Sequence, residues 1–414
     1  MNLGKYSIGI GDRFARQGAA QLAGVIRARD AGVDVTPVWN KSHREHTIIG
    51  TTPQSVRAEA DAAVAELGWS GPYFVDADHV GLETVDLFID ASDFFTLDVA
   101  DAIGRAADED AVRAFVDRHA GLLGEVALPG LDEPLVISKE QMTGAAAKFL
   151  AAVGQAGRIH RHVAAAKGEG TFIAEVSMDE TDAPQTPAEL LVILAAVADE
   201  KIPARTIAPK FTGRFNKGVD YAGDVEVFAA EFARDVAVTA FAARRFDLPD
   251  DLKLSVHSGS DKFSIYPAMR RAIRTLDAGL HLKTAGTTWL EELIGLASAG
   301  GKGLAIARDV YAEALGRFDE LCGPYATVID IDTSRLPAAE TVAAWTGEQF
   351  AAALRHDASC EAYNPHVRQM LHVAYKVAAE MGGRFLDALD AFAEAIAPGV
   401  TENVCARHIR AVFG

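Results

Sequence analysis

The sequence predicts a (β/α)8 barrel of the TIM type, elaborated by an insertion after the third strand and by a helical C-terminal extension. Eight strand-like segments can be counted, most of them alternating with helical segments, and eight is the number at which a parallel sheet with helical crossovers closes. Several of these segments end abruptly in polar residues, as in LKLSVHSGSDKF from 252 to 263. An open doubly wound sheet is disfavoured, because Gly9-Ile10-Gly11 lacks the third glycine of a dinucleotide loop.

The first part of the chain supplies three strands. They are YSIGIG at 6–11, VDVTPVWN at 33–40 and YFVDAD at 73–78. Helical sequence follows the first strand at 15–30, and Thr52-Pro53 begins a helix after the second. The segment from about 80 to 168 fits no strand–turn–helix unit, so we interpret it as the insertion, with helices near 109–123 and 138–166.

Strands and helices then alternate again. The remaining strands are FIAEVS at 172–177, TIAPKF at 206–211, LKLSVH at 252–257, LHLKT at 280–284 and ATVIDID at 326–332. Thr186-Pro187 is expected to begin the helix after the first of these. We therefore predict a catalytic barrel domain over 1–335 and a helical extension over 336–414 packed on the barrel.

Composition excludes several classes of partner. The 414 residues contain 40 Lys and Arg against 58 Asp and Glu, a net charge of −18 that repels nucleic acid and anionic membranes. No apolar run approaches the ~20 residues of a membrane span, and no signal-peptide pattern is visible, so we expect a cytoplasmic protein, with a homo-oligomer left open. The three cysteines are scattered without a CxxC pair, which argues against a disulfide framework or a thiolate metal site.

Three histidines stand at strand ends: His79, His257 and His281. A single histidine there is more often structural, but the strand ends of a barrel converge on one axis, where active sites lie. Neutral imidazoles around an open position suit a divalent cation such as Zn, Mn, Fe, Co or Ni. His366 and His372, six residues apart in the extension, are interpreted as residues of the helical cap.

Carboxylates at the same ends are candidate acids and bases. Alternation along the third strand puts Asp76 and Asp78 on one face, which should be the barrel interior. Charge there is costly unless it is paired or functional. The other candidates are Glu175, Asp179, Asp220 and Asp261, although Asp261 could simply pair with Lys262 on a solvated loop.

Basic residues also gather at or just after strand ends. They are Lys210, Arg214, Lys217, Lys262 and Lys283, with Arg13 as a further candidate. Against the negative net charge, this concentration predicts an anionic small-molecule substrate, for which a carboxylate or a phosphate would serve equally. The alternative is ordinary ion pairing with neighbouring acids.

Four segments together resemble the tagaturonate epimerase family, also called tagaturonate/fructuronate or hexuronate C4-epimerases. They are VDADHVGLETVDLFIDASDFFTLDVAD, APKFTGRFNKGVDYAGD, SVHSGSDKFSIYP and LHLKTAGTTWLEE, within about 73 to 330. The resemblance implies a barrel fold and a metal-dependent interconversion of keto-hexuronates. It also implies that His79, His257 and His281 hold the metal, that Asp78 is the proton acceptor, and that Asp220 is the donor.

The chemistry of that reaction restricts its mechanism. C4 is adjacent to neither the ketone nor the carboxylate, so its hydrogen is not acidic, but its hydroxyl is β to the ketone. This favours a retro-aldol route, in which Asp78 takes the hydroxyl proton, the C3–C4 bond opens, and the fragments rejoin on the other face. The basic residues and Glu175 would bind the substrate. The alternatives are a metal-dependent sugar-acid isomerase or aldolase, and a non-catalytic sugar-acid binding protein.

Overall fold

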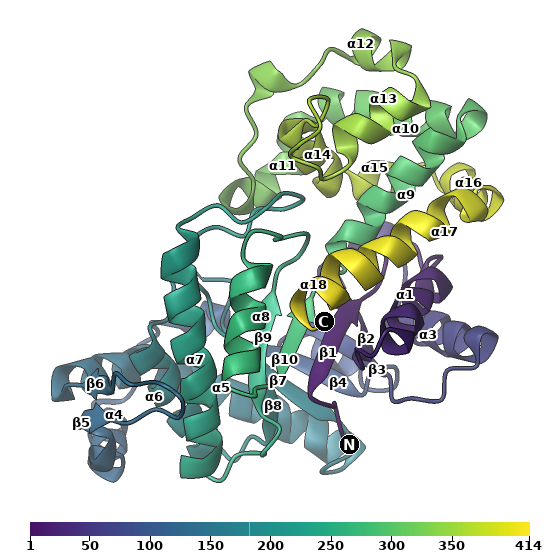
Figure 1. Cartoon of the computed structure of the whole chain (residues 1–414). Helices are drawn as coiled ribbons and strands as arrows, with labels where there is room; N and C mark the ends of the chain where they lie inside the picture. Colours follow the sequence, from purple (N-terminus) through teal and green to yellow (C-terminus); the bar gives the residue numbers. More distant parts are fainter. Residues whose placement is uncertain (182) are drawn as a thin grey trace.

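Eight parallel strands close into a barrel in the computed structural model, which describes residues 1–181 and 183–414 (Figure 1). The strands follow one another around the barrel in chain order. They are β1 (Tyr6–Ile10), β2 (Thr36–Ser42), β3 (Phe74–Val80), β4 (Phe94–Asp98), β7 (Ile173–Ser177), β8 (Ala204–Ala208), β9 (Lys253–His257) and β10 (Leu280–Lys283). The predicted (β/α)8 barrel is confirmed.

Strand β4 lies inside the segment that we interpreted as an insertion. It pairs with β3 on one side and β7 on the other. Phe94 packs with apolar residues at the base of the barrel interior, whereas Phe95 and Leu97 belong to the core under the outer helices, so two adjacent aromatics hide the alternation. The insertion therefore begins one strand later than predicted. It contains α4 (Glu109–Arg118) and the hairpin of β5 (Gly124–Val126) and β6 (Leu135–Ile137), and it leads into α5 (Lys139–Lys167).

The segment 326–332 is not a strand, so our prediction of an eighth strand there was wrong. The chain forms a 3-10 turn over Gly323–Val328 and then an irregular stretch. The side chain of Gln369 makes the two hydrogen bonds that a strand neighbour would make: its Oε1 accepts the Asp330 N–H at 2.8 Å, and its Nε2 donates to the Asp330 carbonyl at 3.0 Å. A side chain from the extension thus satisfies backbone groups that the sequence pattern alone would assign to a sheet.

Helices connect the strands and cover the outside of the barrel. Besides α5 they are α1 (Gly18–Asp30), α2 (His43–Ile49), α3 (Pro53–Leu67), α6 (Pro187–Asp199), α7 (Val225–Arg245) and α8 (Tyr266–Thr275). The predicted starts of α3 and α6 are confirmed, with Pro53 and Pro187 in their first turns. At α6 the Thr186 hydroxyl accepts the Glu189 N–H while the Glu189 carboxylate accepts the Thr186 N–H, a reciprocal cap that fixes where the helix begins.

The helices after β10 build a second apolar core above the barrel (Figure 1). They are α9 (Gly286–Ala299), α10 (Gly301–Gly316), α11 (Phe318–Cys322), α12 (Ala339–Ala344), α13 (Gly347–Leu354), α14 (Pro365–Val373), α15 (Tyr375–Glu380), α16 (Gly383–Ala391) and α17 (Ala393–Glu402). No helix in the described part of the chain has the length and apolar character needed to cross a membrane.

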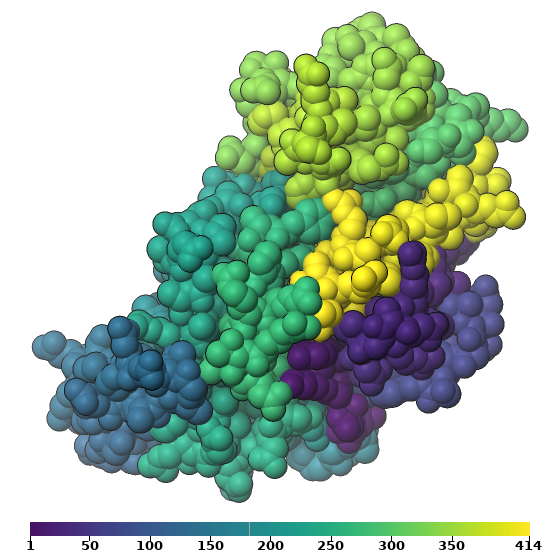
Figure 2. Space-filling model, in the orientation of Figure 1, coloured from purple at the N-terminus to yellow at the C-terminus, as the bar shows by residue number. Residues whose placement is uncertain are grey.

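The end of the chain returns to the barrel. A π-helical turn (Asn403–Ile409) and α18 (Arg410–Val412) pack against α1 and α8, and Figure 2 shows this segment in yellow between the purple N-terminal and green surfaces. Ile409 and Phe413 are part of the barrel core. Because α9 packs in the second apolar core and not in the barrel core, the last residues of the chain occupy the position that an eighth barrel helix would fill.

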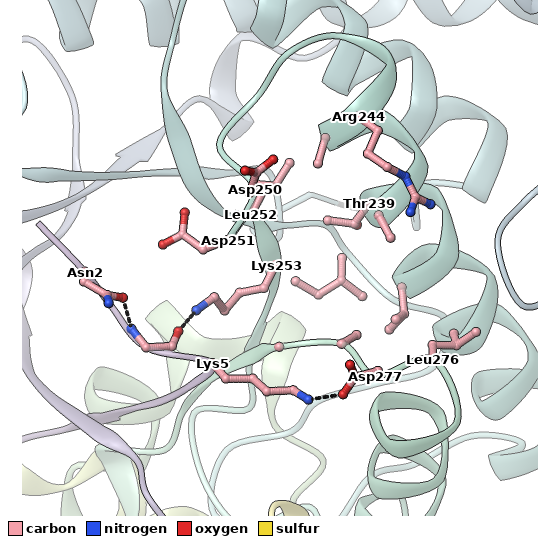
Figure 3. Close-up of a pocket in the computed structure, with 17 residues that line it drawn as sticks. Asn2, Lys5, Thr239, Arg244, Asp250, Asp251, Leu252, Lys253, Leu276 and Asp277 are labelled. Atoms are coloured by element: carbon pink, nitrogen blue, oxygen red, sulfur yellow. Dashed lines mark hydrogen bonds and ion pairs between the residues drawn. The ribbon is translucent and has the colours of Figure 1, made fainter.

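A cavity of about 590 Å³ lies at the N-terminal end of the barrel strands (Figure 3). Its polar groups are largely matched by one another: Lys5 pairs with Asp277, and the Lys253 ammonium donates to the Gly4 carbonyl. This end of a barrel serves stability rather than catalysis, and active sites lie at the opposite end.

Glu291 of α9 gives the fold a pH dependence. Its side chain is 5% exposed, and burial raises the pKa of its carboxyl from 4.5 to about 7. Between these values the unfolded chain loses a proton that the folded protein keeps, so stability falls as the pH rises. We expect Glu291→Gln to increase the free energy of unfolding by about 3 kcal/mol at pH 8 and by almost nothing near pH 4.5, measured by urea denaturation. The exposed Glu169→Gln is the control, and an equal gain at both pH values would contradict the assignment.

Candidate active site

A cavity of about 320 Å³ opens at the C-terminal ends of the barrel strands. Residues at the ends of β2, β3, β4, β7, β9 and β10 line it, together with His372 from α14 of the extension. A second hollow of about 420 Å³ adjoins it and shares Asp179, Lys217 and His257 with it. We call the first of these the catalytic cavity, because His79 and His257 face it.

His79 lies on a distortion of β3. The pairing of β3 with β4 shifts register between Ala77 and Val80, and His79 has a φ of 53°, an unfavourable value for a residue with a side chain. Backbone strain of this kind concentrates at functional sites because it re-aims side chains. Here the ring of His79 comes to 5.1 Å from the ring of His257, and its Nδ1 lies 3.2 Å from Asp98 Oδ2.

His257, at the end of β9, lies between two carboxylates. Its Nε2 is 2.8 Å from Glu175 Oε1, and its Nδ1 is 3.2 Å from Asp179 Oδ2. Burial alone would lower the pKa of this imidazole, but Asp179 and Glu175 raise it to about 9. The surroundings of His257 therefore favour positive charge at this point.

Two groups of side chains are close enough together to hold a metal ion. A ligand atom from each of His79, Asp179 and His257 lies within 4.8 Å of the other two, and His79, Asp98 and Glu180 form a second such group. His281 belongs to neither. It lies deeper in β10, fully buried, with its Nδ1 2.8 Å from the Ser7 hydroxyl. The structure therefore does not bring the three imidazoles together in one group, because His281 lies two residues before the level of His257 in the sheet, opposite Ser255.

Lys283 holds the acidic residues beside this group. Its ammonium lies 2.8 Å from Asp76, 2.9 Å from Asp78 and 2.9 Å from Glu175, and it also donates to the Thr96 hydroxyl. The expectation that Asp76 and Asp78 point into the barrel is confirmed by these contacts. Burial raises the pKa of Asp76 to about 7, whereas the pKa of Asp78 is held well below its usual range despite burial, by Lys283 and the two histidines.

Comparison with known proteins places the chain in a family. Residues 1–385 match the family model described as tagaturonate epimerase. The chain belongs to the tagaturonate epimerase family. It is an enzyme, an epimerase of the isomerase class.

Individual relatives agree with this epimerase assignment. The chain is 28% identical over 384 residues, which is 89% of its length and 72% of the relative, to the tagaturonate/fructuronate epimerase of Thermotoga maritima. Its structure matches that of the native fructuronate-tagaturonate epimerase UxaE from Cohnella laeviribosi with a TM-score of 0.79 at 23% identity, over 100% of this chain and 82% of that one. A glycerol complex of the same protein gives 0.78 at 23% identity, over 98% and 82%. At these identities the structural match establishes the shared barrel fold.

The basic residues predicted to bind substrate are divided among four environments in the epimerase. Lys217 lines both hollows, whereas Lys210 and Arg214 line only the second one. Lys262 lines neither: it is fully buried and donates to the Ser260 hydroxyl at 2.8 Å. Lys283, as described above, faces the catalytic cavity but is surrounded by carboxylates. Of these five residues, Lys217 is the one placed to meet an anionic ligand in that cavity. Arg13, the further candidate, also lines the cavity, but its guanidinium pairs with Glu45.

Besides Asp76, three of the predicted acids and bases lie outside the catalytic cavity. Asp220 lines neither hollow, and its carboxylate accepts hydrogen bonds from the N–H and hydroxyl of Ser264. Glu175 lies beneath the cavity floor, fully buried against His257 and Lys283. Asp261 is not on a solvated loop: it is fully buried and forms an ion pair with Arg368 of α14 at 2.9 Å.

Sequence reasoning missed other residues of the epimerase cavity. His372 was interpreted only as part of the cap, and Asp98 was hidden in the unrecognised strand β4. The signal for Asp98 was available, since TLD ends with a polar residue after an apolar run, as the other strands do. For His372 no local pattern exists, because its place in the cavity follows from how the extension packs.

Proposed function

We propose that the protein interconverts D-tagaturonate and D-fructuronate by inverting C4, with a divalent cation bound by His79, Asp179 and His257. The observation that carries the proposal is this group of possible ligands directly beside Asp78 at the C-terminal end of a barrel. The family and the printed activity of the Thermotoga maritima relative support the choice of substrate.

The donor set fits a divalent cation. Two imidazoles and one carboxylate are a usual set for Zn²⁺ and its neighbours, and they leave coordination positions open for substrate. Each imidazole also has a carboxylate on its other side, Asp98 for His79 and Glu175 for His257, an arrangement that orients metal-binding histidines. A cation bound there would act as a Lewis acid on the ketone of the substrate.

Asp78 is the residue placed to move a proton. Its side chain is 13% exposed toward the catalytic cavity, and the neighbouring Lys283 keeps it ionised and fixed in position. In the retro-aldol route it accepts the C4 hydroxyl proton as the C3–C4 bond opens. The proton must return when the bond re-forms. Because Asp220 lies outside the cavity, we propose that the protonated Asp78 returns it.

Proton NMR of D-tagaturonate incubated with the enzyme in D2O tests this function. We expect the resonances of D-fructuronate to appear, with hydrogen retained at C4, because that hydrogen never leaves its carbon in a retro-aldol reaction. Deuterium at C4 would contradict the route while leaving the epimerisation intact. An aldose product would instead indicate an isomerase, and accumulation of separate fragments would indicate an aldolase.

Metal binding is tested separately by isothermal titration of chelator-treated protein with Zn²⁺ and Mn²⁺. We expect one site, with activity lost on chelation and restored by the cation. His79→Ala should weaken binding by at least about 100-fold, because loss of an outer partner alone costs 10–100-fold. The control is His162→Ala, since His162 lies on the surface, where it pairs with Asp86. Equal binding by both variants would overturn the assignment of the ligands.

A further inference from the structure

Helix α14 of the extension reaches the catalytic cavity through His372. The side chain of His372 is 3% exposed and lines the cavity, and its Nε2 has no hydrogen-bond partner within residues 1–181 and 183–414. Burying a polar group unpaired is unfavourable. The buried Nε2 atoms of His46, His160 and His281 also lack a partner in the described residues, but none of these three residues lines the catalytic cavity. The position of His372 at the cavity wall suggests that a ligand supplies the missing contact.

Three segments meet at this nitrogen. A methyl group on Gly286, at the start of α9, would lie 2.8 Å from His372 Nε2 and 2.2 Å from the Gly259 carbonyl oxygen, so only glycine fits there. The 14-residue helix α9 begins at the cavity wall, and no side chain caps it. The N–H groups of Thr287 and Thr288 donate to the carbonyls of Thr284 and Ala285, so the Gly286 N–H is the one left at this end of the helix. The amino end of a helix carries partial positive charge and binds anions.

Lys217 completes a positive wall. It lines the same cavity, and its ammonium forms no ion pair in the described part of the chain. A side chain at Gly259 would approach this ammonium to 3.6 Å, which places Lys217 beside the same loop. Burial, together with the nearby cations Arg13, Lys217, Arg368 and Lys262, holds the pKa of His372 well below its usual range. The imidazole of His372 is thus neutral, and the cations around it give its surroundings a positive potential.

The catalytic cavity consequently contains two kinds of group. His79, Asp98 and Asp179 are suited to a cation. Lys217, His372 and the start of α9 are suited to an anion, in a protein whose net charge is −18, although Asp179 and Glu180 also lie near Lys217. A keto-hexuronate offers one group for each, with its ketone near one end and its carboxylate at the other.

We propose that Lys217, His372 and the amino end of α9 form the subsite for the C6 carboxylate of the substrate. This inference rests on the proposed function for the identity of the ligand. It assigns to the extension a direct part in substrate binding: α14 supplies His372, whose Nε2 donates to the carboxylate while Lys217 provides the countercharge. The carboxylate stays bound at this subsite while the C3–C4 bond is open, which keeps the fragments together.

Paired ligands that differ only at C6 test the subsite. Isothermal titration measures D-tagaturonate and the neutral ketose D-tagatose binding to cation-loaded Asp78→Asn protein, in which turnover is suppressed. We expect the uronate to bind at least about 100-fold more tightly than the ketose. Lys217→Met or His372→Leu, added to this protein, should reduce the ratio by about 10–100-fold, the range for hydrogen bonds to a charged group. Lys376→Met, on the surface of the same extension, should leave it unchanged.

The outcomes separate this inference from the proposed function. If wild-type protein epimerises D-tagaturonate but both variants keep the full preference for the uronate, the subsite is wrong and the function stands. If wild-type protein does not epimerise it, yet the preference depends on Lys217, the subsite stands and the function is wrong. Lys217→Met serves alone if circular dichroism shows that His372→Leu is misfolded.

Discussion

Asp78→Asn is expected to lower kcat by about 10²–10⁴-fold, the range for removal of a general base. Asparagine has nearly the same shape and can still contact Lys283, but it cannot accept a proton from the C4 hydroxyl. Lys283 lies 2.9 Å from Asp78, and the pKa of Asp78 is well below its usual range, so the wild-type residue is ionised at every pH at which the enzyme would be assayed. The measurement is steady-state epimerisation of D-tagaturonate at saturating cation.

Asp76→Asn is the matched control for this prediction. Asp76 shares Lys283 with Asp78, but it is 2% exposed, does not line the cavity, and has a pKa raised by burial to about 7. At pH 6 it is largely protonated, and asparagine resembles that neutral form. We therefore expect at most about a tenfold loss at pH 6. Equal losses from the two variants would show that the charge around Lys283, and not proton acceptance by Asp78, limits the reaction.

The sequence predicts the barrel and three residues of the candidate site for one physical reason. Side chains alternate along a strand, and the ends of parallel strands share one rim, so local patterns locate His79, His257 and Asp78. The depth of a side chain along the barrel axis cannot be predicted in this way, because it depends on the register in which the strands pair when the barrel closes. His281 and Lys283 both face inward from β10, but only Lys283 reaches the level of His257, with which it pairs in the sheet. A polar residue type near the end of a strand does not tell which of these two residues reaches the cavity.

The contacts that the extension makes with the barrel could not be predicted from the sequence. ATVIDID has the composition of a strand, but the side chain of Gln369 takes the place of a strand neighbour. His372 enters the catalytic cavity, and Arg368 reaches Asp261, from a helix about 100 residues after the loop they contact. These contacts depend on how two apolar cores pack together, which no periodicity in either segment records.

Arg368→Met is expected to destabilise the protein by about 3–5 kcal/mol, because it leaves a buried carboxylate without its countercharge. Arg368 is fully buried, and its guanidinium donates to Asp261 Oδ2 at 2.9 Å and to the carbonyls of Leu354 and Gly218. Its partner Asp261 also lies 3.1 Å from His356 and 3.2 Å from His408, so this one carboxylate joins the loop after β9 to two parts of the extension. The measurement is the change in free energy of unfolding from urea denaturation.

Two further variants decide whether charge or packing is responsible. Adding Asp261→Leu to Arg368→Met removes both charges, so part of the lost stability should return, because an apolar pair of similar volume often replaces a buried ion pair without loss. Arg317→Met, which removes an arginine that pairs with Glu320 and Glu380 on the surface, should cost at most about 1 kcal/mol. If the double variant is no more stable than Arg368→Met, the shape of the arginine and its contacts with the carbonyls dominate.

Arg368→Met should also affect substrate binding, because His372 lies one helical turn after Arg368. We expect His372 to be displaced from the catalytic cavity, so the KM for D-tagaturonate should rise under conditions in which Arg368→Met is still folded.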